Sequence, residues 1–138
     1  MEAELSDAEL IAAFEKRLLP PQAWNHCAHV RVAFIYASQF GFEAALAQMR
    51  AGLHALNAAH RVPNAADRGY HETITVAFMR LVFAACKQQP FSSSVDFCHA
   101  HSELMTKDAL LHYYSRERLT SVAAKAAFIE PDVRPLPA

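Results

Sequence analysis

Two segments, residues 26–40 and 70–87, constrain the fold of this chain most, because each is apolar on nearly every side of a helix. Each segment has one thin stripe of polar residues spaced seven apart, Arg31 and Ser38 in the first and Thr73, Arg80 and Lys87 in the second. Residues seven apart share a helix face, so these stripes mark the expected outward sides. A helix that is apolar almost all round is buried. The chain must therefore supply further helices to cover this pair.

Capping and stop residues divide the rest of the chain. Ser6 and Glu9 form a capping box before the first apolar positions, and Pro20 ends that helix. Asn25 is a suitable N-cap, and Gly41 a suitable stop, for the next. We expect helices over about residues 6–19, 25–40, 42–60, 70–87, 92–105 and 107–115. At most one short helix and an extended, proline-rich arm follow them.

The 138 residues fit one domain with a hydrophobic core. Only three glycines occur, which disfavours an architecture rich in β-turns. We therefore predict one all-α domain over residues 1–138. Its core is an up-and-down bundle of about four helices, joined by two short helices and an extended C-terminal arm.

Composition narrows the possible partners and location. The net charge is −1 and no basic stripe is present, so a nucleic-acid-binding surface is not expected. Arg31 and Arg80 interrupt the longest apolar stretches, which favours a protein that does not span a membrane. The acidic start lacks the apolar segment of a signal peptide. Cys27, Cys86 and Cys98 are widely spaced, as in a cytoplasmic protein with reduced, buried thiols.

The chemistry we expect comes from the direction of the helices. Short connections favour antiparallel neighbours, so the second and fourth helices begin at the same end of the bundle, where the third ends. His29 lies about 200° around its helix from Arg31 and so points inward. The side chains that topology gathers at this end are His26, His29, His60, Tyr70, His71 and Glu72. This convergence depends on topology, since no linear reaction motif is present.

Several roles are open to this cluster. Imidazole and carboxylate ligands suit zinc or non-haem iron, which makes His26, His29, His71 and Glu72 candidate metal ligands. Without a metal, His71 and Glu72 are candidates for a catalytic acid and base. Candidate ligand-binding residues are Tyr70, Arg31 and Tyr114, although the helical wheel puts Arg31 on the outer stripe. Each histidine could equally have only a packing role.

We therefore predict a small-molecule-binding or enzymatic pocket at one end of a helix bundle, built on His29, His71 and Glu72 and dependent on a divalent metal in one version. The alternative is a non-enzymatic interaction or structural module. Apolar helices can also be buried against a second subunit, so that module would be a homodimer in which the histidines serve packing.

Four strings of this sequence resemble a family of small all-helical bacterial proteins to which no activity is assigned. They lie at residues 24–34 (WNHCAHVRVAF), 70–75 (YHETIT), 113–119 (YYSRERL) and 130–137 (EPDVRPLP). The resemblance implies one small helical domain with His29 and His71 in its signature strings. It implies no substrate, cofactor or catalytic role.

Overall fold

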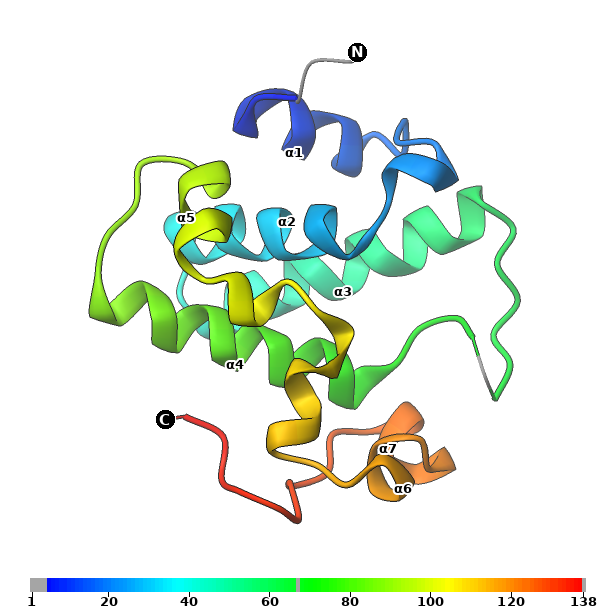
Figure 1. Cartoon of the computed structure of the whole chain (residues 1–138). Helices are drawn as coiled ribbons and strands as arrows, with labels where there is room; N and C mark the ends of the chain where they lie inside the picture. The colour runs from blue at the N-terminus through cyan, green and yellow to red at the C-terminus, as the bar shows by residue number, and fades with distance from the viewer. Residues whose placement is uncertain (1–4, 67, 138) are drawn as a thin grey trace.

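The computed structural model describes residues 5–66 and 68–137 and is all-α, which confirms the predicted fold class (Figure 1). The α-helices are α1 (Asp7–Glu15), α2 (His26–Gln39), α3 (Phe42–Ala59), α4 (Glu72–Gln88), α5 (Ser94–Ala100), α6 (Arg116–Leu119) and α7 (Val122–Ala126). Short 3-10 helices cover Pro21–Ala23, Ser102–Leu104 and Lys107–His112. Within the described ranges no strand forms, and no helix is long and apolar enough to cross a membrane.

The predicted caps are present where the helices start. Ser6 and Glu9 form both hydrogen bonds of the capping box, and the Asn25 side chain accepts from the N–H of Ala28 at 2.9 Å. The fourth helix begins at Glu72, two residues later than predicted, because His71 is its N-cap. The predicted helices over residues 92–105 and 107–115 are broken into α5 and two 3-10 helices.

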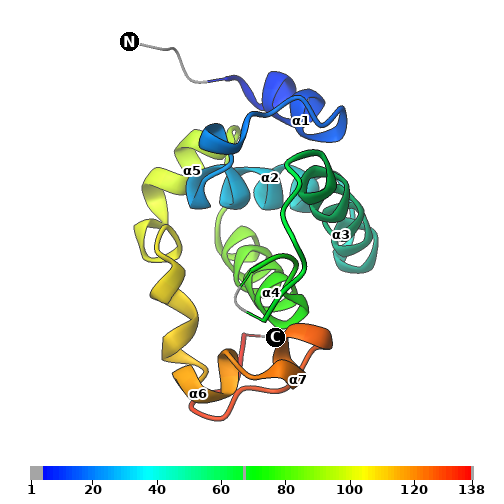
Figure 2. The same ribbon diagram turned by 90° about the vertical axis from the view of Figure 1, so that its right-hand side faces the viewer.

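Helix α2 lies at the centre of the fold and packs against α1, α3, α4 and α5. Helices α2, α3 and α4 alternate in direction, so α2 and α4 begin at the end where α3 finishes, on the right of Figure 1. The chain from α5 to α6 then descends along one side of α2 and α4, as Figure 2 shows. The structure is thus a three-helix core with α1 and the C-terminal half of the chain as covers.

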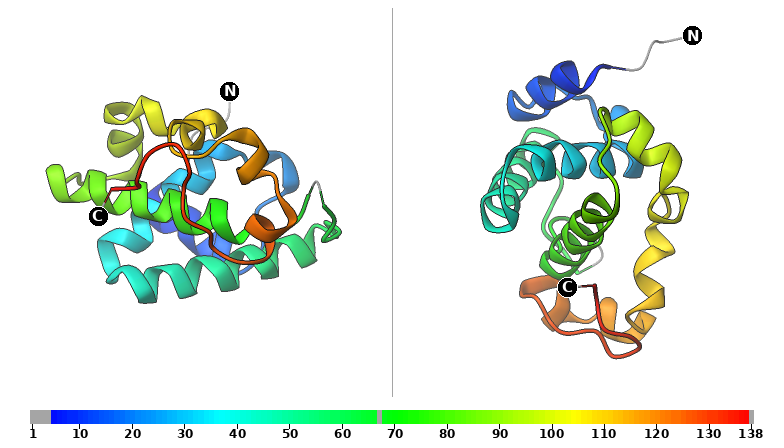
Figure 3. Two further views of the ribbon diagram at one scale, coloured as in Figure 1. Left: turned by 90° about the horizontal axis from the view of Figure 1, so that it is seen from below. Right: turned by 90° about the vertical axis from the view of Figure 1, so that its left-hand side faces the viewer.

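The C-terminal segment packs beneath α4, with α7 against that helix (Figure 3). Residues 127–137 contain no helix, as predicted for an extended arm. The carbonyl of Tyr113 accepts the N–H groups of Val133 and Arg134 at 2.9 and 3.2 Å. The hydroxyl of Tyr114, a fully buried side chain, donates to the carbonyl of Ile129 at 2.6 Å. The arm is therefore held by backbone hydrogen bonds as well as by packing.

The predicted outward stripes of α2 and α4 are wrong at two positions. Arg31 is 7% exposed and Thr73 is fully buried. Thr73 Oγ1 donates to the carbonyl of Ala127 at 2.9 Å and accepts the N–H of Ile129 at 3.2 Å, so the C-terminal arm covers it. A helical wheel identifies a polar stripe, but it does not show whether water or another segment of the chain covers that stripe.

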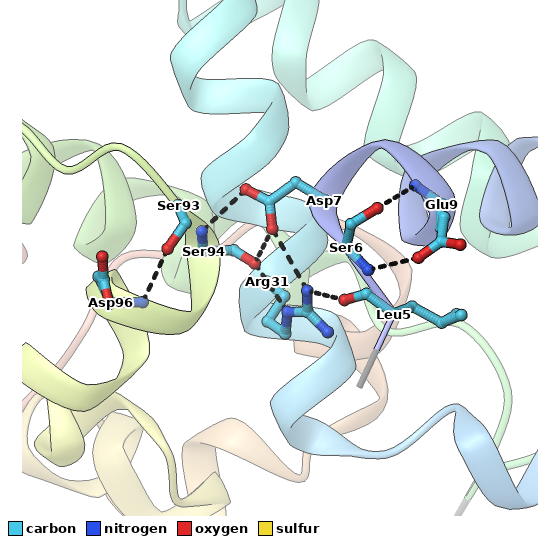
Figure 4. Close-up of polar contacts among 8 residues, drawn as sticks. All are labelled: Leu5, Ser6, Asp7, Glu9, Arg31, Ser93, Ser94 and Asp96. Carbon is cyan, nitrogen blue, oxygen red and sulfur yellow. Dashed lines mark hydrogen bonds and ion pairs between the residues drawn. The ribbon is translucent and has the colours of Figure 1, made fainter. Parts of the chain in front are cut away.

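Arg31 binds the start of the chain to α5 (Figure 4). Its Nε donates to Ser94 Oγ at 2.7 Å, and its Nη2 donates to the Leu5 carbonyl at 2.6 Å and to Asp7 Oδ1 at 3.3 Å. Asp7 also accepts from the backbone N–H and the hydroxyl of Ser94 at 2.8 and 2.5 Å. This network joins α1, α2 and α5, so Arg31 has a structural role there.

Candidate functional site

A cavity of about 810 Å³ lies among α2, α3 and α4, at the end where α2 and α4 begin. Its buried lining is mostly apolar and comprises Val30, Ala33, Met49, Leu53, Thr75, Met79, Val82 and Leu119. The more exposed lining is largely polar and includes Asn25, His26, His29, Asn57, Arg68, Tyr70, His71, Thr120 and Lys125. Sites of this size and composition bind small molecules that are mainly apolar, and the few polar groups orient the ligand.

The cavity brings together only part of the predicted cluster. His26, His29, Tyr70 and His71 contribute to its lining. Glu72, Arg31 and Tyr114 do not, although each was a predicted site residue. The alternating directions of the three core helices therefore bring His26, His29 and His71 to one cavity, but not His60, and the directions of the other side chains had no sequence signal.

His71 is held at both ring nitrogens by the backbone. Its Nδ1 accepts the N–H of Ile74 at 3.1 Å, and its Nε2 lies 2.9 Å from the carbonyl of Leu119. A carbonyl only accepts, so Nε2 carries the hydrogen and the ring is neutral. Burial, the main cause, lowers the pKa of His71 from its ordinary value. His71 thus caps α4 and connects it to α6, and protonating Nδ1 would break the cap.

His26 and His29 occupy the first turn of α2 and are half-buried. His26 Nε2 donates to the carbonyl of Leu104 at 2.8 Å, and its ring meets the edge of Phe78 with centroids 5.0 Å apart. The ring of His29 lies against Trp24 with centroids 4.1 Å apart. His60 resembles His26, since its Nε2 donates to the carbonyl of Leu19 at 2.7 Å, but it lies outside the lining.

Glu72 belongs to a group of interacting side chains that does not include His71. Its carboxylate accepts from Arg50 Nε at 3.0 and 3.1 Å, from Arg50 Nη2 and from the hydroxyl of Tyr70 at 2.5 Å. Burial acts to raise the pKa of Glu72, but hydrogen bonds from Arg50 and Tyr70 outweigh it and lower that pKa. Burial and the hydrogen bond to Glu72 raise the pKa of Tyr70 to about 12. The predicted acid–base pair of His71 and Glu72 therefore does not meet.

The predicted metal ligands do not form a ready metal centre. No group of three or more His, Cys, Asp or Glu side chains in residues 5–66 and 68–137 is arranged to hold an ion. Both nitrogens of His71 and the carboxylate of Glu72 already have protein partners. These residues do not fit zinc or iron as they stand, and metal binding stays an untested prediction.

The cysteines also differ from prediction in one respect. Cys27, expected to be a buried inert thiol, is exposed, whereas Cys98 is buried. Burial, with a smaller effect of the nearby Cys27, raises the pKa of Cys98 to about 12. Cys27 does not line the large cavity but borders a second, smaller hollow together with Arg31, Val95 and Cys98.

The loop between α3 and α4 covers one side of the cavity and is tied down at several points. Gly69 has φ +94°, and a Cβ there would come within 2.9 Å of Pro63 O, so the turn needs glycine. Lys125 Nζ donates to the carbonyl of Tyr70 at 2.8 Å and to the side-chain oxygen of Asn64. Sequence reasoning missed Lys125 and Arg68, because a charged residue in an irregular segment gives no sign of the cavity that it borders.

No protein-family model, curated protein or solved structure matches this chain. The resemblance to the family of small helical bacterial proteins stays a prediction.

Proposed function

We propose that this protein binds a small, mainly apolar molecule in the cavity among α2, α3 and α4. The observation that carries the proposal is the cavity itself, which combines about 810 Å³ of space with an apolar buried lining. A fully packed core has few voids larger than a water molecule. A space of this size next to close-packed helices therefore favours a role in ligand binding.

The polar lining supports binding more than catalysis. His71, the predicted catalytic base, cannot take a proton at Nδ1 without losing the cap of α4. The carboxylate predicted to assist it is bound to Arg50 and Tyr70. His26, whose Nε2 is fixed by the Leu104 carbonyl, is the histidine of the lining best placed to orient a polar group of the ligand. We therefore assign the histidines to fixing the walls and orienting the ligand.

A neutral fluorescent probe, N-phenyl-1-naphthylamine, tests the proposal. Its emission rises on transfer into an apolar site, so titration gives an affinity and a stoichiometry. We expect one site per chain in the wild type. Ala33→Phe should abolish binding, because residue 33 is 3% exposed and lines the cavity, so the added ring fills the space. Ala44→Phe, on the exposed face of α3, is the matched control and should bind as the wild type does.

Circular dichroism must show that Ala33→Phe is folded. If it is not, Ala66→Trp gives the same test, since residue 66 lines the cavity from an exposed loop. Probe binding that survives in the folded filled variant would refute the proposal, as would the absence of saturable binding in the wild type.

A further inference from the structure

The charge around the cavity is one-sided. Arg68 and Lys125 both contribute to the lining, and no carboxylate belongs to the described part of it. The ion pairs among the described residues involve other cations, Arg31, Arg50 and His101. Within residues 5–66 and 68–137, then, the two positive charges at the cavity have no carboxylate partner.

Lys125 is held at the cavity by neutral groups. Its ammonium donates to the carbonyl of Tyr70 at 2.8 Å and to the side chain of Asn64, and the residue is half-buried. Carbonyl oxygens satisfy hydrogen bonds but do not cancel a charge. Burial lowers the pKa of His71, and the charge of Lys125 acts in the same direction, as expected for an ammonium near this part of the lining. A partly buried ammonium that has no counter-ion among the described residues favours an anion beside it.

The arginine adds geometric preference. Arg68 is exposed and forms no ion pair with another described residue, and a guanidinium can pair with a planar carboxylate through two parallel hydrogen bonds. Two cations beside an otherwise apolar wall match a ligand with one anionic group and a much larger apolar part. The wall for that apolar part comes from Met49, Leu53, Ile74 and Phe78.

We propose that the ligand is an amphipathic carboxylate, whose apolar chain or ring system lies against the α3 and α4 side chains of the cavity and whose carboxylate lies at Arg68 and Lys125. This inference rests on the proposed function, because it names the chemical class of the molecule that the cavity binds. It adds a recognition role for two residues outside the histidine cluster.

Three probes of equal chain length separate the contribution of the head group to binding from that of the chain. They are octanoate, 1-octanol and octylamine, each used at a concentration below that at which it aggregates. Isothermal titration calorimetry at pH 7.5 measures the three affinities, and we expect octanoate to bind most tightly, octanol less tightly and octylamine least tightly. We expect octanoate to bind about tenfold more tightly than octanol, which corresponds to about 1.4 kcal/mol for a charge that is partly exposed to water. Acetate, which has the head without the chain, should not bind measurably.

Variants then assign the head-group site. Arg68→Gln and Lys125→Gln should each weaken octanoate binding about three- to tenfold and leave octanol binding unchanged. Lys125→Arg should restore the affinity for octanoate because it keeps the charge. Lys87→Gln, at the exposed far end of α4, is the control and should have no effect. If Lys125→Gln disturbs the loop and lowers thermal stability, Arg68→Gln decides, because no structural bond of the Arg68 side chain forms among the described residues.

The outcomes distinguish the two proposals. If octanol binds as tightly as octanoate, or if the Gln variants weaken both equally, the carboxylate site is refuted while cavity binding stands. If none of the three chain-bearing probes binds although N-phenyl-1-naphthylamine does, the carboxylate proposal fails while cavity binding stands. If N-phenyl-1-naphthylamine does not bind either, both proposals fail.

Discussion

Replacement of His71 tests whether this residue fixes the fold or performs chemistry. In His71→Ala, α4 loses its N-cap and the half-buried connection to Leu119 is lost. Loss of an N-cap costs about 1 kcal/mol, and loss of a neutral hydrogen bond costs about 1 kcal/mol. We therefore expect the free energy of unfolding to fall by about 2 kcal/mol. In His71→Asn the free energy of unfolding should fall by only about 1 kcal/mol, because asparagine can cap the helix but cannot reach Leu119.

The pH dependence gives a second, independent readout. The folded-state pKa of His71 is lowered from 6.5, so the unfolded chain binds the proton more readily. The stabilisation from neutral His71 is therefore complete above about pH 6.5 and is lost as the pH falls from there through the lowered folded-state pKa. His71→Asn lacks this titration, so its stability deficit relative to the wild type should shrink between pH 7.5 and pH 5.

Urea denaturation followed by circular dichroism at both pH values measures these differences. The difference in the free energy of unfolding between wild type and variant isolates the effect of His71, because the other seven histidines are present in both proteins. If His71→Ala were as stable as the wild type, or if the deficit of His71→Asn grew at pH 5, the assignment of His71 as a neutral cap would be wrong.

Three further predictions concern the rest of the fold. Gly52→Ala should lower the free energy of unfolding by about 1–2 kcal/mol, because a Cβ there would lie 2.2 Å from the fully buried ring of Phe14. Helix propensity alone predicts that the free energy of unfolding rises by about 1 kcal/mol, so a more stable variant would refute the packing argument. Arg31→Met should lower the free energy of unfolding by about 2 kcal/mol, because charged hydrogen bonds that join α1, α2 and α5 are lost, and an unchanged urea midpoint would contradict this. Ellman's reagent should react quickly with the exposed Cys27 and slowly with the buried Cys98, whose pKa is raised to about 12, so Cys27→Ser should remove the fast phase; a fast phase that persists would show that another thiol is accessible.

The sequence predicts the helical core well because several local signals agree. The capping box at Ser6, the cap at Asn25 and the stop at Gly41 mark helix ends that the structure contains. The connections predict that α2, α3 and α4 alternate in direction, as they do, although the connection between α3 and α4 runs over residues 60–71. That order in turn places His29 and His71 on one cavity.

The rest depends on contacts between distant segments, which periodicity does not encode. Arg31 looks outward on a helical wheel, yet Ser94 and Asp7 cover it. Glu72 looks like a partner for a histidine, yet it binds Arg50 from α3. An apolar position such as Met49 has the same pattern whether its side chain fills a core or borders a cavity, so the space itself could not be predicted.

Methyl NMR of the methionines tests the central claim most directly, because it reports where a ligand binds. Met49 and Met79 line the cavity, whereas Met105 lies outside it and serves as an internal control. In protein labelled with ¹³C at the methionine methyl groups and titrated with N-phenyl-1-naphthylamine, we predict saturable shifts of the Met49 and Met79 signals and a stationary Met105 signal. Unchanged Met49 and Met79 signals at probe saturation, or a shift confined to Met105, would contradict the assignment of this cavity as the ligand site.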